Sequence, residues 1–302
     1  MQTTLPTTEW RLARRTLTLG PRTLVMAIVN VTPDSFSDGG RYFSPQAAID
    51  RALQALDEGA AILDLGGEST RPGSHAGGDD PAVDALAEQE RLLPVIAGVL
   101  QARPDAVISI DTYKAATARA ALAAGAAIIN DVSGFAWDPA MAAICARARC
   151  GVVLMHTRGL PDEWAGQPAL PAEEMMADVR QGLTVSLEVA QHAGVAPEAI
   201  ALDPGYGFGK RFDENFALLA RQQVLLGLGR PLLVGLSRKS FLGQKLAPLY
   251  GGQPAPVEAR ETASAAALTA SILAGASIVR VHAVRPAVEA AAIADAVRAA
   301  QP

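Results

Sequence analysis

The stretch SPQAAIDRALQALDEGAAILDLG, residues 44–66, contains a helix signal followed by a strand signal. Ser44 is typical of a helix N-cap and Pro45 of the first helical position, and apolar residues then recur at helical spacing until Gly59. The run 62–66 is apolar except for Asp64 and does not alternate, which favours a strand buried on both faces of a parallel sheet. The stretch therefore predicts a helix that leads through a short loop into a buried strand.

The same unit recurs along the chain. Short β-branched runs occur eight times, at residues 25–30, 62–66, 107–111, 128–131, 152–156, 200–203, 232–237 and 278–282. Three of them follow a Gly-Ala pair, at 59–60, 125–126 and 275–276, as expected where glycine ends a helix. Eight βα units without a composition break predict an α/β fold, a single (β/α)8 TIM barrel over residues 1–302, with residues 1–20 as an N-terminal extension. An open doubly wound sheet is the alternative.

Three polar, glycine- and proline-rich segments interrupt this pattern, at residues 71–82, 158–172 and 243–257. We expect them to be extended βα loops. In a barrel such loops emerge at the carboxyl face of the strands, where barrel enzymes place their active sites.

The composition limits what the protein can do. Of the 302 residues, 50% are apolar and 19% are charged, which excludes a disordered chain. The net charge of −5 gives no basic footprint for nucleic acid or for an anionic membrane. Two cysteines suggest neither a disulfide framework nor a zinc site, and the first residues lack the apolar core of a signal peptide. We therefore expect a cytoplasmic protein that binds neither nucleic acid nor a membrane.

Polar side chains stand at the ends of most of the expected strands. They are Asn30, Asp64, Asp111, Asn130, His156, Asp203, Lys239, Arg280 and His282. A single Asp or Asn there could simply cap the following helix, and we assign that structural role to Asp64. Asp111 and Asp203 end apolar strands, where an unpaired carboxylate is costly, so a functional role is favoured. For His156, core packing and ligand contact remain equally open.

Four local motifs are more specific than single strand ends. They are residues 30–40, a polar loop with one aromatic; 66–73, Gly-Gly-Glu-Ser-Thr-Arg-Pro-Gly; 203–210, Asp-Pro-Gly-Tyr-Gly-Phe-Gly-Lys; and 237–240, Ser-Arg-Lys-Ser. The glycines allow close backbone approach, and the hydroxyl and guanidinium groups can meet an anion. The third motif is not a nucleotide P-loop, because Pro204 replaces the required glycine and no Ser or Thr follows Lys210.

At these motifs the chain resembles the dihydropteroate synthases, the pterin-binding barrel enzymes of folate biosynthesis, from about residue 26 to residue 284. The resemblance implies a transferase that joins 7,8-dihydropterin-6-ylmethyl diphosphate to 4-aminobenzoate and releases diphosphate with the help of Mg²⁺. It also implies a homodimer, inhibition by sulfonamides, and a dissociative reaction through a pterin methylene cation.

The resemblance also implies a set of site residues. The expected pterin contacts are Asp111, Asn130, Met155, Asp203 and Lys239. The expected diphosphate contacts are Asn30, Thr70, Arg71, Arg280 and His282, with Asn30 also a Mg²⁺ ligand. The expected aminobenzoate contacts are Phe36, Pro72, Phe208 and Ser240, and the expected catalytic residues are Asp38, Arg71 and Lys239. Core packing for Met155 and loop capping for Asp38 remain equally possible.

Two features depart from the family pattern, and two alternative functions compete with it. The loop after Gly73 is longer than usual, and Ala283 stands where the family commonly has Asp.

A methyltetrahydrofolate-binding methyltransferase shares the barrel but would not need the anion-binding motifs. A non-catalytic paralogue would be expected to lose Asn30, Arg71 or His282, and all three are present.

Overall fold

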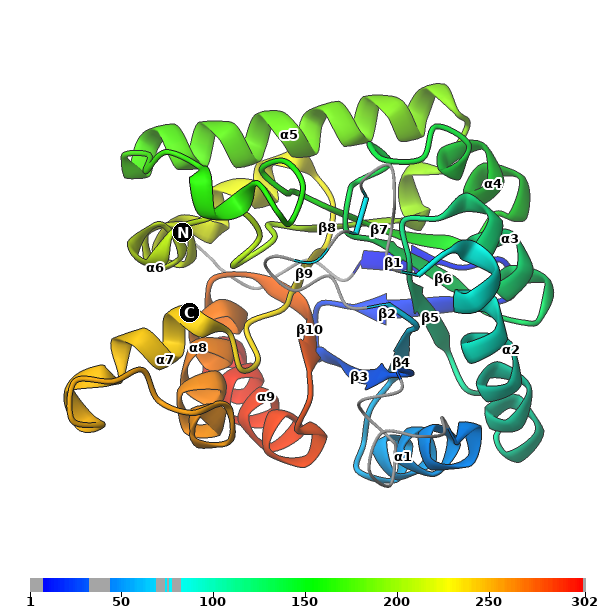
Figure 1. Cartoon of the computed structure of the whole chain (residues 1–302), viewed down its shortest axis with the longest axis horizontal. Helices are drawn as coiled ribbons and strands as arrows, with labels where there is room; N and C mark the ends of the chain where they lie inside the picture. Colours follow the sequence, from blue (N-terminus) through cyan, green and yellow to red (C-terminus); the bar gives the residue numbers. More distant parts are fainter. Residues whose placement is uncertain (1–7, 33–43, 69–73, 75, 78–82, 301–302) are drawn as a thin grey trace.

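The protein forms a closed parallel barrel. A computed structural model describes residues 8–32, 44–68, 74, 76–77 and 83–300. The barrel strands follow the order β10-β3-β4-β5-β6-β7-β8-β9, and closure comes from the parallel pairing of β10 with β3, in which Ile278 lies opposite Leu24. Helices surround this barrel in Figure 1. The predicted TIM barrel is confirmed, and the open sheet is excluded because the two end strands pair.

The strands match the predicted runs, with small differences. They are β3 (Leu24–Asn30), β4 (Ile62–Gly66), β5 (Ile108–Asp111), β6 (Ile128–Asp131), β7 (Gly151–Met155), β8 (Ile200–Asp203), β9 (Leu232–Val234) and β10 (Ala276–Val281). The prediction of a six-residue strand over 232–237 was wrong, because the strand pairing of β9 ends at Val234. His156 and His282 lie one residue beyond the strands that were expected to contain them.

The helices lie between the strands as predicted. The α-helices are α1 (Pro45–Asp57), α2 (Ala85–Ala102), α3 (Ala115–Ala123), α4 (Met141–Ala148), α5 (Ala172–His192), α6 (Phe212–Arg221), α7 (Ser240–Lys245), α8 (Glu261–Leu273) and α9 (Val284–Ala299). Short 3₁₀ helices are η2 (Trp164–Gly166), η3 (Pro197–Ala199), η4 (Gln222–Leu228), η5 (Ala247–Leu249) and η6 (Val257–Arg260). None of the helices in the described part of the chain is both long and apolar enough to cross a lipid bilayer.

Local signals fixed several boundaries. Ser44 is the N-cap of α1 with Pro45 as its first residue, although the Ser44 side chain makes no capping hydrogen bond. Gly59, Gly125 and Gly275 have φ of 107°, 112° and 97°, which side chains disfavour, and each lies between a helix and the next barrel strand. The expected loop 243–257 is partly helical, since it contains the end of α7 and all of η5.

The barrel interior is divided into an apolar end and a polar end. One interior apolar cluster contains Met26, Ile62, Val107, Ile128, Val153, Ala201, Leu233 and Ile278. Because strand side chains alternate between faces, residues two and four positions further on also point inward. These include Asp64, Asn130, Asp203 and Arg280. The alternation therefore gathers polar side chains above the apolar cluster, toward the carboxyl ends of the strands.

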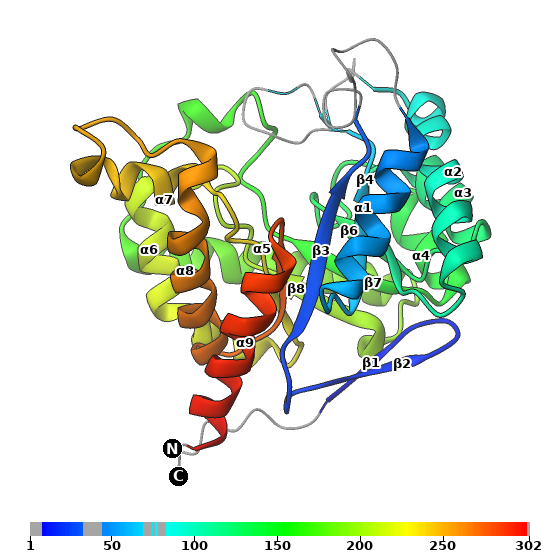
Figure 2. The ribbon, with the colours of Figure 1, turned by 90° about the horizontal axis from the view of Figure 1, so that it is seen from below.

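An N-terminal hairpin closes the apolar end. Residues 1–20 were expected only as an extension, but β1 (Thr8–Arg11) and β2 (Thr16–Leu19) pair antiparallel. Figure 2 shows this hairpin across the end of the barrel opposite to the βα loops. Trp10 is fully buried in the apolar cluster with Leu12 and Leu19, and its indole Nε1 donates to the Ala199 carbonyl at 2.8 Å. The hairpin thus completes the core and excludes water from below the site.

Replacement of Trp10 by alanine should destabilise the whole barrel. The variant loses a fully buried aromatic side chain and leaves a cavity, so we expect W10A to reduce the free energy of unfolding by about 3–5 kcal/mol. Urea unfolding followed by circular dichroism measures the change. E9A, on the exposed face of the same strand, is the matched control and should change stability by less than about 0.5 kcal/mol. A cost for W10A close to that of E9A would contradict this role of the hairpin.

Candidate active site

The polar end of the barrel is organised around Arg280 of β10. Its Nε donates to Oδ2 of Asp64 at 2.6 Å, and its Nη2 donates to Oδ2 of Asp111 at 2.5 Å. Asp64 is fully buried in β4 and also accepts hydrogen bonds from Ser109 Oγ at 2.6 Å and Asn130 Nδ2 at 3.0 Å. The guanidinium is therefore tied to two carboxylates from different strands, and Asp64 ties Asn130 to the same group.

This cluster places two carboxylates around one cation in a poorly solvated space. Burial raises the pKa of Asp111 to about 7, and the nearby Asp64 charge adds to the effect, while Arg280 opposes it. Burial disfavours the charge of Arg280, but the attraction of Asp64 and Asp111 outweighs it and raises the Arg280 pKa. Arg280 thus stays charged, whereas Asp111 changes its protonation state near neutral pH.

Asp203 and Lys239 form a second charged group at the barrel end. Asp203 ends β8 and is 5% exposed, and its Oδ1 accepts from the Gly205 amide at 2.7 Å. Burial raises the Asp203 pKa, opposed by that hydrogen bond and by Lys239. Desolvation lowers the Lys239 pKa to about 8, opposed by Asp203. Lys239 Nζ lies 3.9 Å from the Phe208 ring centroid, so a flat ligand here would meet a carboxylate, an ammonium group and an aromatic ring.

The loop that follows Asp203 is held by Lys210. Its Nζ donates to the carbonyls of Gly205 at 2.9 Å, His156 at 3.2 Å and Phe208 at 3.3 Å. Burial lowers the pKa of Lys210 to about 7. Sequence reasoning assigned no role to this lysine beyond the rejected P-loop. Lys210 shapes the loop that presents Phe208.

Met155 lies in an apolar wall at the barrel end. It is 5% exposed and packs in a cluster with Ala76, Tyr113 and Val132, against which Trp137 and Phe208 also lie. Phe208 additionally meets the Trp164 ring edge-on, with centroids 5.1 Å apart. Core packing of Met155 is therefore observed. A contact between Met155 and a pterin remains a prediction.

His282 lies beside Arg280 but is positioned by β9 and the segment after it. Its Nδ1 is 3.0 Å from Ser237 Oγ, and its amide donates to the same hydroxyl at 3.2 Å. His282 is the first residue after β10, which ends at Val281. The Ser237 hydroxyl therefore contacts both the backbone amide and the imidazole of His282.

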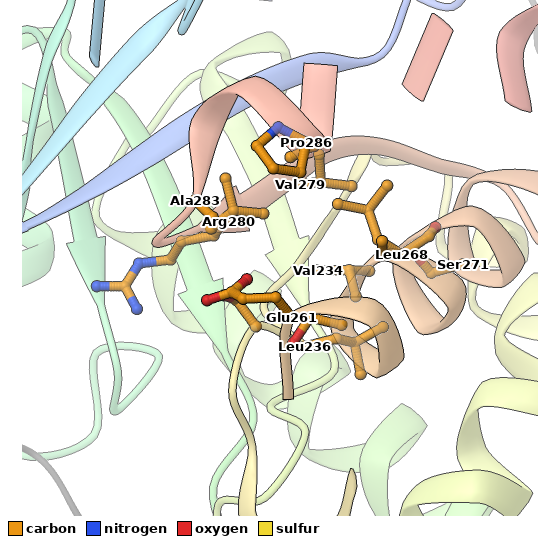
Figure 3. Close-up of a pocket in the computed structure, with 14 residues that line it drawn as sticks. Val234, Leu236, Glu261, Leu268, Ser271, Val279, Arg280, Ala283 and Pro286 are labelled. Atoms are coloured by element: carbon orange, nitrogen blue, oxygen red, sulfur yellow. The ribbon is translucent and has the colours of Figure 1, made fainter. Parts of the chain in front are cut away.

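A small cavity of about 20 Å³ lies behind Arg280, between β9, β10, α8 and α9. In Figure 3 the Arg280 guanidinium points away from the other labelled residues of this cavity. The cavity has room for about one water molecule. Ala283 is among the residues that line it. This space is therefore the outer side of the Arg280 strand and not a substrate site.

His156 belongs to the packing between the barrel and α5. It is 7% exposed, and its Nε2 lies 3.4 Å from Asp178 Oδ2 of α5. Burial, with the nearby charges of Lys210 and Arg158, lowers its pKa well below the ordinary value. A buried, neutral imidazole packed against α5 favours core packing over ligand contact, the two roles that were left open for His156.

The remaining predicted residues are placed as follows. Asn30 ends β3 opposite Gly66 and is half-buried, and Ser240 is the exposed first residue of α7. Phe36, Asp38, Thr70, Arg71 and Pro72 lie outside the described residues. The structure thus brings four of the predicted site residues together at one end of the barrel, namely Asp111, Asn130, Asp203 and Arg280.

The sequence missed the groups that hold the site in place. Asp64 had been given only a local capping role, but it contacts Ser109, Asn130 and Arg280. Lys114 forms ion pairs with Glu68 and, at 3.5 Å, with buried Glu88, whose pKa is raised by burial. The sequence signal for Asp64 was a charged residue inside an apolar run.

Possible metal ligands are few. Among the residues with described positions, no group of three or more His, Cys, Asp or Glu side chains could hold a metal ion. The Asn30 amide oxygen at the end of β3 is a hard donor of the kind that Mg²⁺ takes when phosphate oxygens and water fill the rest of its shell. The donor set therefore fits a metal that arrives with a phosphate ligand.

Comparison with known proteins shows the family of this chain. The model of the family described as pterin binding enzyme matches residues 26–282. The dihydropteroate synthase of Synechocystis sp. is 42% identical over 277 residues, covering 92% of this chain and 91% of that protein. The crystal structure of the Yersinia pestis dihydropteroate synthase with a sulfonamide drug is 37% identical with a TM-score of 0.85, covering 97% of this chain and 100% of that chain.

A further structure is the dihydropteroate synthase of Xanthomonas albilineans in complex with 7,8-dihydropteroate. It is 37% identical with a TM-score of 0.80, covering 97% of this chain and 100% of that chain. The fold and the site define a TIM-barrel enzyme with a cluster of polar and charged side chains at the carboxyl ends of its strands. The chain belongs to the pterin-binding enzyme family and, within it, to the dihydropteroate synthases.

The Asp111 titration should appear in the pH dependence of activity. Because the Asp111 pKa is raised to about 7, its carboxylate, which holds Arg280, is protonated below that pH. We expect kcat/KM to rise with pH through an apparent pKa near 7 in the wild-type enzyme. The D111N variant should have lower activity and should lose this limb, with its fold checked by circular dichroism. An unchanged acid limb in D111N would contradict the assignment.

Proposed function

We propose that this protein is a dihydropteroate synthase, which joins 7,8-dihydropterin-6-ylmethyl diphosphate to 4-aminobenzoate and releases diphosphate in folate biosynthesis. The observation that carries this proposal is the convergence of Arg280, Asp111, Asn130 and Asp203 at one end of the barrel. Carboxylates for a pterin and a fixed cation for a diphosphate lie together there. The family membership supports the same reaction.

The pterin ring is held by acceptors from neighbouring strands. A reduced pterin presents a planar edge of N–H donors beside a carbonyl acceptor, and Asp111, Asn130 and Asp203 offer oxygen acceptors at the ends of β5, β6 and β8. Lys239 donates to an acceptor of the ring. With a pKa of about 8, it is mostly protonated at neutral pH and can play this part. Met155 packs on the face of the ring, in the wall that it already forms.

The diphosphate is held by cations and amides from several strand ends. Arg280 is locked by two carboxylates and so presents its remaining N–H groups in a fixed direction. His282, Asn30, Thr70 and Arg71 complete the group. Asn30 is the protein ligand for Mg²⁺, which supplies charge neutralisation of the leaving diphosphate when it is bound.

The reaction is dissociative. The C–O bond between the pterin methylene and the diphosphate breaks first, and the electron pair leaves with the diphosphate, where Arg71 and Arg280 stabilise the charge. The methylene cation is delocalised over the pterin, next to the carboxylates of Asp111 and Asp203. The amine of 4-aminobenzoate then attacks the methylene carbon and loses a proton. No protein nucleophile is required for these steps.

The aminobenzoate lies in a slot beside Lys239. Phe208 forms one wall, already held by Lys210 and Trp164, and Phe36 and Pro72 form the others. The Ser240 hydroxyl, exposed at the start of α7, faces the carboxylate of the substrate. Asp38 accepts the amine proton or orients water for its removal.

Two further properties belong to this proposal. The protein acts in the cytoplasm, in keeping with Cys145 and Cys150, which are both free thiols. It works as a homodimer paired through its last helices. Exposed apolar side chains on α8 and α9 support this pairing, namely Leu273, Ile293 and Val297.

Removal of the Asp203 carboxylate should abolish pterin binding. A charge-assisted hydrogen bond contributes about 1.5–3 kcal/mol, and Asp203 offers two acceptor oxygens to the ring, so D203A should bind a pterin at least about 100-fold more weakly. Isothermal titration calorimetry with 7,8-dihydropterin measures the loss. D162A, at an exposed loop position, is the matched control and should bind like the wild type. Wild-type affinity in a folded D203A variant would remove Asp203 from the pterin site.

The function itself is tested by the release of diphosphate. With the dihydropterin diphosphate as substrate and Mg²⁺ present, a coupled assay should detect rapid release only when 4-aminobenzoate is added. The product should be 7,8-dihydropteroate, identified by mass spectrometry. Release at the same rate without 4-aminobenzoate, or no release in its presence, would contradict the proposed transfer.

A further inference from the structure

A large cavity lies at the end of the barrel opposite to the candidate active site. Its volume is about 630 Å³, within the range of small-molecule sites. It lies between the turn of the β1–β2 hairpin and the ends of α2, α3 and α4, together with the loops that lead into β5 and β6. In Figure 2 the hairpin turn lies below the ends of α3 and α4. The cavity is therefore separate from the pterin site, with the barrel core between them.

Four arginines line this cavity, namely Arg14, Arg15, Arg119 and Arg147, and no acidic residue does. Arg15 donates from Nη1 to the Asp105 carbonyl at 2.5 Å. For the other three, no hydrogen bond or ion pair joins the guanidinium to any residue of the described ranges. All four residues are exposed to solvent, so their guanidinium groups can reach a ligand in the cavity.

Helix ends account for only part of this charge. The carboxyl ends of α2, α3 and α4 border the cavity, and each helix carboxyl end carries roughly half a negative charge. Three such partial charges do not neutralise four guanidinium groups, so the lining stays positively charged. The cavity is thus suited to a ligand with several negative charges.

The floor of the cavity is aliphatic. Leu100, Leu122 and Ile144 come from the three helices and lie among alanines. An inorganic anion would leave this floor and most of the volume unfilled, and a fatty acid would supply only one negative charge. A ligand with a phosphate chain and a compact ring body would match the lining, because the phosphates suit the arginines and the ring suits the aliphatic floor.

We propose that this cavity binds an organic polyphosphate of the nucleotide class. The phosphates contact the guanidinium groups of Arg14, Arg15, Arg119 and Arg147, and the ring body covers the aliphatic floor. This site is independent of the proposed synthase reaction, because none of its lining residues belongs to the barrel mouth.

The test uses ATP, with inorganic triphosphate and adenosine as separate probes, on the full-length protein at low salt without Mg²⁺. We expect calorimetry to show ATP binding that weakens at least tenfold in R119E and in R147E. R180E, an exposed position on α5 with the same change of charge, is the matched control and should bind ATP like the wild type. Synthase turnover without ATP should be unchanged in R119E, which also shows that the variant is folded.

Three results would overturn the proposal. The first is no ATP binding at millimolar concentration, and the second is equal affinity in R119E, R147E and the wild type, which would place ATP elsewhere. The third is inorganic triphosphate binding as tightly as ATP, which would show that the aliphatic floor takes no part. Weaker binding of both triphosphate and adenosine than of ATP would support the two-part site.

Discussion

The candidate active site depends on one buried interaction, the pairing of Arg280 with both Asp64 and Asp111. A guanidinium inside a barrel is stable only when carboxylates pair with it, and removal of either partner leaves a buried charge uncompensated. Because β10 and β4 lie on either side of β3, and β5 lies beyond β4, the pairing also ties separate parts of the barrel together. One cation therefore serves both the packing of the barrel and the recognition of an anion.

The barrel can support this polar cluster because its other end is apolar. Strand side chains alternate in direction, so the inward positions form successive levels, with Ile62 and Ile278 below Asp64 and Arg280. The hairpin with Trp10 closes the lower level. The low polarity of this base strengthens the electrostatic interactions above it. At that polar end, burial of Asp111 raises its pKa to about 7. Stability and chemistry are thus concentrated at opposite ends of the same strands.

Much of this arrangement could be predicted from the sequence, because it follows from local patterns. The βα units, the helix stop at Gly59 and the polar residues at the ends of β5 and β8 all have short-range signals. The partners of those residues could not be predicted in the same way. Asp64 and Arg280 are 216 residues apart, and their contact depends on barrel closure, which no local pattern specifies. The N-terminal hairpin was missed for the same reason, because the role of Trp10 depends on its contacts with the base of the barrel, which is distant in the sequence.

A double-mutant cycle tests the central role of Arg280 most directly. The measurement compares kcat/KM for the wild type, D64N, R280K and the D64N/R280K double variant. If Asp64 acts by positioning Arg280, the D64N substitution will reduce kcat/KM strongly in the wild type and only slightly in R280K, with a coupling energy of at least about 1 kcal/mol. Effects that add to within about 0.3–0.5 kcal/mol would show that the two residues act independently and would contradict this account.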